Sequence, residues 1–422
     1  MRANKFANFV LIGGLLFFGM ILAYVFYRII YANLNLFFAV IPFVGILICS
    51  FAFKLRPDYK INFVLTGLSI FFVVFFAEIV LFFYPNIEAK RINQAKKMGI
   101  SFDTRTRLKV IDELKKQGVD AVPFLFPNKF IKSDGLERAN GEKIFPVGAI
   151  SQKTTVFCNE NGKYTIYESD EHGFNNPKGL FEVDKIDLIL IGDSFTHGAC
   201  VRQGEDIASQ LRRMSELRVI SLGSIANGPL VEFATLKEYG QPLRPKYVLW
   251  MYYEQNDLDD LKLEQTSFLL KYRDGQFSQH LITRQSEIDF LLGEYLQKWK
   301  VRKRKIHPLR ILKLYNLRKR LGFMIIQQPP PFSLFTELLE KANFLTSSWG
   351  GQLYFVYLPS WERYAKDVEH GTFQHRNRVL SIVKHLNIPI IDMHEKVFAV
   401  HPDPVSLFPL GFRDTTRVKA IV

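Results

Sequence analysis

Three long apolar stretches occupy the first 84 residues of the chain. They run from Phe6 to Ile30, from Ala32 to Phe53 and from Ile61 to Tyr84, and the only charged residues inside them are Arg28 and Glu78. A helix of roughly 20 residues crosses a hydrocarbon core of about 30 Å, so each stretch is long enough to span a membrane. A signal peptide would be shorter and would not be followed by two similar segments. The pattern predicts a three-helix transmembrane anchor over residues 1–84.

Basic residues gather at one end of these predicted helices. The N-terminus and the loop between the second and third helices hold Arg2, Lys5, Lys54, Arg56 and Lys60, whereas residues 31–35 carry no charge. The positive-inside rule therefore places the N-terminus in the cytoplasm and, after three crossings, the rest of the chain outside it. Basic residues between positions 90 and 97 oppose this orientation, although long domains translocate largely regardless of charge. We expect an extracytoplasmic C-terminal domain.

Glu78 is an ionisable residue inside the third apolar stretch. Such a residue is a functional candidate by default, for example as a contact for a partner membrane protein. The alternative is a carboxyl group that is protonated or that reaches toward the interface. The sequence leaves both interpretations open.

Beyond residue 144 the pattern changes to short apolar runs bounded by turn residues. Enough chain for a crossover helix separates these runs, which indicates an α/β domain over residues 144–422 with a parallel sheet and helices on both faces. Residues 85–143 are expected to form a polar juxtamembrane region with one helix at Thr106–Gly118. The five predicted strands are Ile186–Ile191, Arg218–Leu222, Tyr247–Tyr252, Gln352–Leu358 and Ile388–Ile391.

Polar residues follow the first three predicted strands. Ser194 lies in Gly192-Asp193-Ser194-Phe195-Thr196 after the first strand, Gly223 follows the second, and Asn256 follows the third. Ligands of such sheets bind beyond the carboxyl ends of the strands, so these residues should converge. A serine at a strand-to-helix turn suits a nucleophile, and backbone N–H groups with a side-chain amide suit an oxyanion hole.

These residues, in this order and at these strand ends, resemble the SGNH or GDSL hydrolases over roughly residues 145–410. Three smaller matches resemble the membrane-anchored bacterial branch of that family: residues 173–177 (Gly-Phe-Asn-Asn-Pro), 227–229 (Asn-Gly-Pro) and 256–258 (Asn-Asp-Leu). The resemblance implies a flavodoxin-like α/β/α fold, with Ser194 as nucleophile and with Ser194, Gly223 and Asn256 forming the oxyanion hole.

The same resemblance implies a class of activity. Members are similar to esterases and O-acyl (acetyl) transferases, and many act on acetylated cell-surface glycans, so polysaccharide modification is the expected process. The expected substrate is an acylated glycan or a lipid-linked saccharide, and a membrane acyltransferase is a candidate partner. The location implied is the bacterial inner (cytoplasmic) membrane. No cofactor is expected.

The family's last block, a catalytic His usually with an Asp, is where this chain departs from the pattern. Two histidines follow the fifth predicted strand, His394 and His401, but the Gly-His-Tyr sequence expected near residues 411–418 is absent. One explanation is that His401 or His394 acts as the base, although a solvated loop histidine is the plainer interpretation of His401. The other is an altered tail, because codons for Arg-Asp-Thr-Thr-Arg-Val read one frame over can encode Gly-His-Tyr-x-Gly. A serine without a base is a weak nucleophile.

The chain has three cysteines, Cys49, Cys158 and Cys200. Cys49 lies in a predicted membrane helix, where it is expected to pack. Cys158 and Cys200 belong to the domain expected outside the cytoplasm, where a disulfide can form, and the alternative is two free thiols. No Cys and His cluster has the spacing of a zinc site, so no metal is expected.

A basic insertion lies between the third and fourth predicted strands, at about residues 262–345. Lys298 to Arg320 holds eleven Lys or Arg and no acid, with leucines recurring among them. A basic amphipathic stretch of this kind favours a membrane surface with anionic headgroups. An anionic glycan and a merely solvated face are the alternatives, and nucleic acid is not expected for an exported domain.

Composition agrees with this division. The 422 residues are 48% hydrophobic, which excludes a disordered chain, and eleven of the net +14 charges come from Lys298 to Arg320. The predicted protein is thus a membrane-anchored serine ester hydrolase or acyl transferase. The alternative is a non-catalytic binding or scaffold protein of a glycan-modifying membrane complex, which keeps the fold and has lost the histidine.

Overall fold

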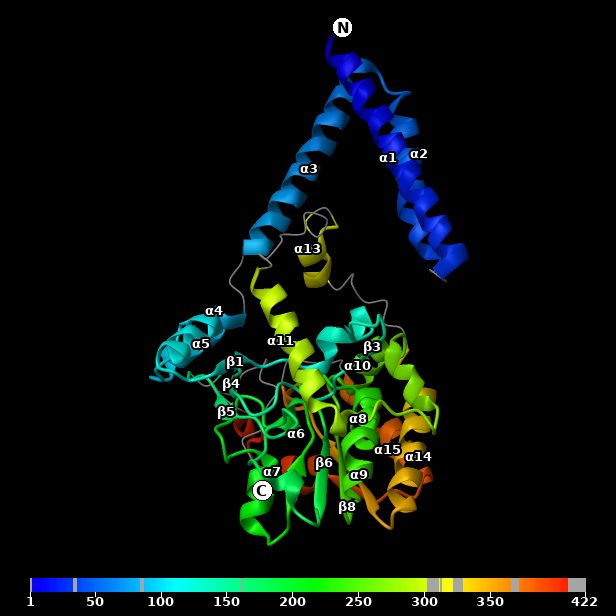
Figure 1. Ribbon diagram of the computed structural model, residues 1–422. Helices are drawn as coiled ribbons and strands as arrows, with labels where there is room; N and C mark the ends of the chain where they lie inside the picture. The colour runs from blue at the N-terminus through cyan, green and yellow to red at the C-terminus, as the bar shows by residue number, and fades with distance from the viewer. Residues whose placement is uncertain are drawn as a thin grey trace. The chain divides into compact units, whose positions relative to one another are not determined.

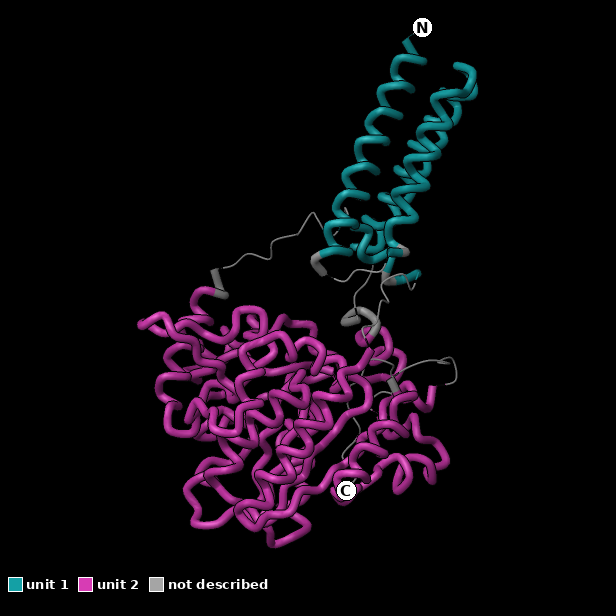
Figure 2. The backbone as a smooth tube through the Cα atoms, turned by 90° about the vertical axis from the view of Figure 1, so that its right-hand side faces the viewer, with its two compact units in different colours: residues 1–84, 305–326 teal, residues 85–304, 327–422 magenta. Residues whose placement is uncertain are grey.

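The computed structural model divides the chain into two compact units, drawn in different colours in Figure 2. Unit 1 comprises residues 1–84 and 305–326, and unit 2 comprises residues 85–304 and 327–422. The residues that the structure describes are 2–32, 36–83, 87–160, 162–301, 311, 313–321, 329–365 and 372–408.

Unit 1 is built of apolar helices. Two of them, α1 (Arg2–Ala32) and α3 (Pro57–Phe83), are long and apolar enough to cross a membrane. The expected crossing at residues 32–53 is represented by the 3-10 helix η1 (Leu36–Ala39) and the 13-residue helix α2 (Val40–Ala52). Two of the three predicted crossings therefore have helices of sufficient length, and the one in the middle stays a prediction.

The contacts in unit 1 show in which direction its helices run. A Cβ on Gly45 of α2 would lie 2.7 Å from the Phe18 ring of α1, so the two helices approach closely there. A Cβ on Gly14 would lie 3.0 Å from Cys49 Sγ, and the two pairs together make α1 and α2 antiparallel. Lys60 Nζ donates to Asn8 Oδ1 at 3.1 Å, which joins the start of α3 to the start of α1.

Unit 2 contains a five-stranded parallel sheet with the order β10-β9-β8-β6-β7, as Figure 1 shows in part. The strands are β6 (Leu188–Gly192), β7 (Val219–Ser221), β8 (Tyr247–Tyr253), β9 (Gln352–Leu358) and β10 (Ile390–Asp392). They coincide with the five predicted strands within about two residues at each end. The prediction of an α/β fold with a five-stranded parallel sheet is confirmed.

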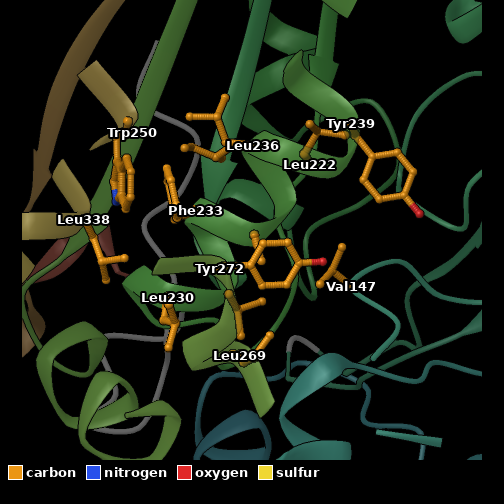
Figure 3. Packing of buried hydrophobic residues seen from close by; sticks show 14 of the residues in the cluster. Val147, Leu222, Leu230, Phe233, Leu236, Tyr239, Trp250, Leu269, Tyr272 and Leu338 are labelled. Atoms are coloured by element: carbon orange, nitrogen blue, oxygen red, sulfur yellow. The ribbon is translucent and has the colours of Figure 1, made fainter. Parts of the chain in front are cut away.

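Side chains of these strands alternate between two apolar clusters. On β8, Val248 and Trp250 belong to the larger cluster, whereas Met251 belongs to the smaller one on the other face. Because successive side chains of a strand point to opposite faces, this alternation shows a sheet covered on both sides. The helices α8 (Pro229–Thr235), α14 (Phe332–Ser348) and α15 (Arg376–His385) supply the larger cluster, part of which is drawn in Figure 3, and α7 (Ile207–Met214) supplies the smaller one.

Residues 85–143 belong to unit 2. The helix predicted at Thr106–Gly118 is present as α5 (Arg107–Lys116), and the Thr106 side chain caps it by accepting from Lys109 N–H. Its buried Val110 packs with Val156 of a three-stranded sheet, β1-β4-β5. The other elements up to residue 144 are α4 (Ile87–Lys97), β1 (Ala121–Pro123), η2 (Pro127–Ser133), β2 (Leu136–Glu137) and β3 (Lys143–Ile144). The strands β4 (Thr154–Val156) and β5 (Ile166–Glu168) follow them.

The insertion between β8 and β9 is largely helical where it is described. It contains α11 (Gln285–Val301) and α13 (Tyr315–Arg320), and α14 ends it. Much of Lys298 to Arg320 lies outside the described residues, but α13 is described and belongs to unit 1. The other elements of unit 2 include η3 (Leu180–Glu182), α6 (Ser194–His197), η4 (Leu236–Gly240), α9 (Gln241–Leu243), α10 (Asp257–Glu264), η5 (Phe268–Arg273), η6 (Leu281–Thr283), η7 (Trp361–Tyr364), η8 (Thr372–His375), η9 (His394–Phe398) and η10 (Pro404–Leu407).

Two phenylalanines of α14 provide a matched test of the core. Phe335 is 0% exposed and packs against the sheet, whereas Phe344 on the same helix is 77% exposed. Phe335→Ala should lower the free energy of unfolding of unit 2 by about 3–5 kcal/mol, because it removes buried apolar surface and leaves a cavity. Phe344→Ala should change it by less than about 0.5 kcal/mol. Denaturant unfolding followed by tryptophan fluorescence measures both, and equal losses would contradict the observed burial.

Candidate active site

Ser194 is the first residue of α6 and directly follows the turn at the end of β6. The turn is tight: a Cβ on Gly192 would overlap Thr196 Oγ1 and would lie 2.9 Å from Met251 Cβ. Asp193 caps α6 by accepting from Phe195 N–H at 2.9 Å. The turn thus requires a glycine at position 192 and is capped by Asp193, and together they hold Ser194 at the carboxyl end of β6.

Gly223 lies against the helix α6, which begins with Ser194. A Cβ at this position would lie 2.6 Å from the backbone N of His197 and 2.7 Å from the carbonyl carbon of Thr196. The Gly223 carbonyl contacts His197 Nδ1 at 3.3 Å, and Ser224 N–H donates to Gly192 O at 3.2 Å. The structure thus brings the segment after β7 and the helix of Ser194 together, and only a glycine permits this approach.

Asn256 follows β8 and begins α10. Its amide Nδ2 donates to Asp260 Oδ2 at 2.6 Å. In this structure the amide donor is therefore directed at the Asp260 carboxylate. It would have to turn from Asp260 to bind an oxyanion.

Several carboxyl groups are buried around this turn. Asp193, Glu232 and Asp257 are each 0% exposed. Burial raises the pKa of Asp193 to about 6, against hydrogen bonds from Phe195 and Ser194, and it raises the pKa values of Glu232 and Asp257 well above their usual range. Repulsion from neighbouring carboxyl groups raises the pKa values of Glu232 and Asp257 further, so protons are retained among these groups near neutral pH. Glu232 was not predicted as a site residue, because in the sequence a single acidic residue in a helix looks like an ordinary solvent-exposed side chain.

The Gly-Phe-Asn-Asn-Pro segment at 173–177 connects the turn of Ser194 to β7. Asn175 Nδ2 donates to His197 O at 2.9 Å. Asn176 Oδ1 accepts from Ser221 N–H at 2.8 Å, and its Nδ2 donates to Ser221 O at 2.9 Å and to Asp170 Oδ2 at 2.7 Å. Both asparagines are buried, so they position the helix of Ser194 and the strand that leads to Gly223.

Cys158 and Cys200 are joined by a disulfide, with their Cα atoms 5.4 Å apart. Cys200 comes six residues after Ser194, and Cys158 follows β4 of the three-stranded sheet. The crosslink therefore connects that sheet to the segment after α6. Cys49 of α2 is a free cysteine.

His394, one candidate base, begins η9 after β10. Its Nδ1 and the Tyr364 hydroxyl are 2.7 Å apart, and burial together with the nearby Arg363 and Arg376 lowers its pKa. Asp392, the acid nearest to it in sequence, forms an ion pair with Arg376 and accepts from His394 N–H at 3.0 Å. The imidazole Nδ1 thus faces a tyrosine rather than the carboxylate that orients the base of a catalytic triad.

His401, the other candidate base, lies in the loop before η10. Its Nδ1 accepts from Asp403 N–H at 3.1 Å, which closes a local turn. The tail where the family's Gly-His-Tyr block would stand, residues 411–418, lies outside the described residues. The assignment of the base stays a prediction for both histidines.

A buried ion pair at the ends of β8 and β9 was not predicted. Glu254 is 3% exposed and accepts from Arg363 Nη2 at 2.6 Å, from Ser360 N–H at 2.7 Å and from the Tyr357 hydroxyl. Arg363 is followed by Tyr364, the partner of His394, so this pair fixes the segment beside that histidine. The strand-end rule would have found Arg363 if it had been applied to the fourth predicted strand as well.

Within the described part of the chain, no three His, Cys, Asp or Glu side chains form a group that could hold a metal ion. A surface cavity of about 400 Å³ lies beside α15, where its lining includes Arg376, Lys384 and His385. It is lined by none of Ser194, Gly223 and Asn256. This cavity is therefore separate from the candidate active site at the strand edge.

No protein-family model matches this chain, and no curated protein is significantly similar to it. A protein described as lipolytic and of the G-D-S-L family, from Desulfitobacterium hafniense DCB-2, is 13% identical with a TM-score of 0.28, over 50% of this chain and 79% of that one. An acetyl xylan esterase is 11% identical with a TM-score of 0.29, over 51% and 80% of the two chains. Similarities this slight carry no argument, so the function has to be inferred from the residues of this chain.

The buried carboxyl groups make stability depend on pH, and Glu264 tests this. Burial raises its pKa to about 8, although Gly228 N–H and Leu230 N–H donate to it at 2.6 and 3.0 Å. Its pKa in the unfolded chain is about 4.3, so the folded state binds the proton more tightly, and stability falls as the pH rises from about 4 to about 8. The unfolding midpoint should be higher at about pH 5.5 than at about pH 8, and Glu264→Gln should reduce this difference.

The matched control is Glu340→Gln, an exposed acid on α14. It should leave the difference between the two midpoints unchanged. Thermal unfolding of the full chain at both pH values measures the effect, and an undiminished difference in Glu264→Gln would show that this carboxyl group does not contribute.

Proposed function

We propose that this protein is a membrane-anchored serine esterase or O-acyl transferase that acts through an acyl-Ser194 intermediate. The observation that supports this best is the packing at the strand edge, where Gly223 has no room for a Cβ against the helix that Ser194 begins. The oxyanion donors that we propose are the N–H of Ser194, the N–H of Gly223 and the Asn256 amide, which would have to turn away from Asp260. That set matches a developing oxyanion better than it matches a structural turn.

The reaction divides into two steps. Ser194 Oγ attacks the carbonyl carbon of an ester, the ester C–O bond breaks, and the alcohol leaves with a proton. Water then attacks the acyl-serine in an esterase, or a second hydroxyl group does so in a transferase. Each attack needs a base to take a proton. His401 and His394 remain the candidates, and an intact Gly-His-Tyr tail is the competing hypothesis.

The substrate proposal follows from the resemblance at 173–177, 227–229 and 256–258. An O-acetylated surface polysaccharide or a lipid-linked glycan is the substrate class that we propose, with a membrane acyltransferase as partner. Because folds of this type host many activities, the substrate class depends on these three motifs and not on the fold.

We place the catalytic unit outside the cytoplasm of a bacterial inner membrane. The antiparallel packing of α1 on α2 and the contact between the starts of α1 and α3 favour three crossings, because the chain must return between two helices that run the same way. The disulfide between Cys158 and Cys200 also favours an oxidising compartment.

The second candidate is a non-catalytic scaffold of a glycan-modifying complex. The specific observation in its favour is that His394 Nδ1 faces Tyr364 and Asp392 pairs with Arg376, so these two residues do not form the oriented pair of a triad. The scaffold would use the same strand edge to bind a glycan without cleaving it.

Activity on a short-chain aryl ester separates the two candidates. We expect the full chain in detergent to hydrolyse such an ester, Ser194→Ala to abolish hydrolysis, and Asn256→Ala to lower kcat by about 10²- to 10³-fold because an oxyanion donor is lost. Ser267→Ala is the matched control, because Ser267 is also a buried serine at the start of a short helix. Equal rates for the wild type and Ser194→Ala would favour the scaffold, and activity that appears only with a Gly-His-Tyr tail would favour the altered-tail hypothesis.

The location is tested by fusing a reporter after Val422 that is active only outside the cytoplasm. Three crossings predict an active reporter, because an odd number of spans places the two ends of the chain on opposite sides. A second reporter, active only in the cytoplasm, should be silent at the same position. The reverse result would place the catalytic unit in the cytoplasm.

A further inference from the structure

Glu78 is completely covered although it lies on an exposed apolar helix. It lies five residues before the end of α3, and its neighbours Phe76, Ile79 and Val80 are exposed. The helix α13, which is more than 230 residues further along the chain, covers it. Unit 1 therefore includes a segment of the basic insertion, and a carboxylate in α3 is the point of contact.

Three donors converge on the Glu78 carboxylate. Asn316 donates to Oε1 through its backbone N–H and through its side-chain Nδ2, both at 2.9 Å. Leu317 N–H donates to Oε2 at 2.7 Å. These backbone groups belong to the first turn of α13, where N–H groups have no partner within the helix. The carboxylate and the helix end thus satisfy each other, and a buried charge on an apolar surface requires such partners.

The contact supplies Glu78 with a partner inside the same chain. The sequence left open whether this residue contacts a separate membrane protein or reaches an interface. Both carboxylate oxygens accept hydrogen bonds from α13, so Glu78 joins α13 to α3. The position of Glu78 on α3 therefore determines where the basic side chains around α13 lie.

Glu78 lies about 7.5 Å from the end of α3 along the helix axis, because the end is five residues away at 1.5 Å per residue. In a spanning helix this is the outer part of the hydrocarbon core, within reach of the headgroups for long side chains. Lys313, Arg318 and Arg320 flank or belong to α13 and are exposed, and the apolar Leu321 next to them is also exposed. An exposed leucine among exposed cations is the composition of a helix that lies at a membrane interface.

We propose that α13 is an interfacial helix held on α3 by Glu78, and that Lys313, Arg318 and Arg320 bind the headgroups of anionic phospholipids at that end of α3. This inference goes beyond the proposed ester chemistry, because it assigns a lipid-binding role to unit 1. It commits to a lipid rather than a glycan, because the cations are fixed to a membrane-length helix and are accompanied by an exposed apolar side chain.

The first test measures where α13 lies. The full chain with Cys49→Ala and Leu321→Cys is placed in phospholipid nanodiscs and reacted with an uncharged, water-soluble maleimide. Cys158 and Cys200 are joined in a disulfide and do not react. With phosphatidylglycerol present, Leu321→Cys should react about tenfold more slowly than in phosphatidylcholine alone, because the cations draw α13 onto an anionic surface. Glu78→Ala should speed the reaction in both lipids.

The second test measures the lipid directly, by native mass spectrometry of the full chain released from the same nanodiscs. The wild type should retain phosphatidylglycerol in preference to phosphatidylcholine, and replacing Lys313, Arg318 and Arg320 with Gln should lower this preference by about fivefold per side chain. The matched control replaces three exposed lysines of unit 2, Lys116, Lys246 and Lys384, with Gln. Asp58→Ala, which removes an exposed acid from the other end of α3, is the control for Glu78→Ala.

The outcomes decide each part separately. Equal retention of both lipids by the wild type would overturn the lipid assignment, and preference for an added anionic glycan over phosphatidylglycerol would do the same. Unchanged labelling in Glu78→Ala would overturn the role of Glu78. If Glu78→Ala fails to fold, Glu78→Gln replaces it in the test, because it keeps the shape of the side chain and removes one carboxylate oxygen. Ester hydrolysis is not measured in either experiment, so the result is independent of whether the protein is an esterase.

Discussion

The candidate active site depends on the absence of side chains at two positions. Gly192 and Gly223 lie where the end of β6, the end of β7 and the helix α6 converge, and a Cβ at either position would overlap backbone or side-chain atoms of the nucleophile segment. These contacts bring a serine hydroxyl and backbone N–H groups to one strand edge. Larger residues would push the segments apart and separate Ser194 from the segment that contains Gly223. Close packing of the backbone at these two glycines is thus a requirement for the arrangement of the candidate site.

The same edge concentrates buried charge. Asp193, Glu232 and Asp257 are buried together, and burial with mutual repulsion raises their pKa values. Burying a carboxyl group costs free energy even when it is protonated, unless it is fully hydrogen-bonded, so the presence of these groups beside Ser194 is costly. Natural proteins accept such costs mainly at functional sites, which favours the catalytic or binding interpretation over a purely structural turn.

The basic insertion belongs to two parts of the molecule. Its flanking helices α11 and α14 lie in unit 2, whereas α13 packs with the apolar helices of unit 1 through Glu78. The division follows from the energetics of a buried carboxylate, which needs several donors, and from the unpaired N–H groups of a helix start. The basic insertion is continuous in the sequence, but the contact between Glu78 and α13 assigns its middle part to unit 1.

The sequence by itself determined the elements that depend on local patterns. Period and length of apolar runs predicted the strands of the parallel sheet and the two long apolar helices, because strand and helix formation respond to the spacing of apolar residues. The order of Ser194, Gly223 and Asn256 at successive strand ends followed from the same pattern.

Only the tertiary structure decided which side chains meet. It showed Asn256 directed at Asp260, His394 beside Tyr364, Glu254 paired with Arg363, and Glu78 bound to α13. Three of these pairs join residues that are 30 or more positions apart, and a local sequence pattern gives no sign of such contacts. Asn256 and Asp260 are close in sequence, but their contact depends on the orientation of one amide. Burial, hydrogen-bond geometry and pKa arise from such long-range contacts, so the sequence could place Ser194 at a strand end but could not show which side chains surround it.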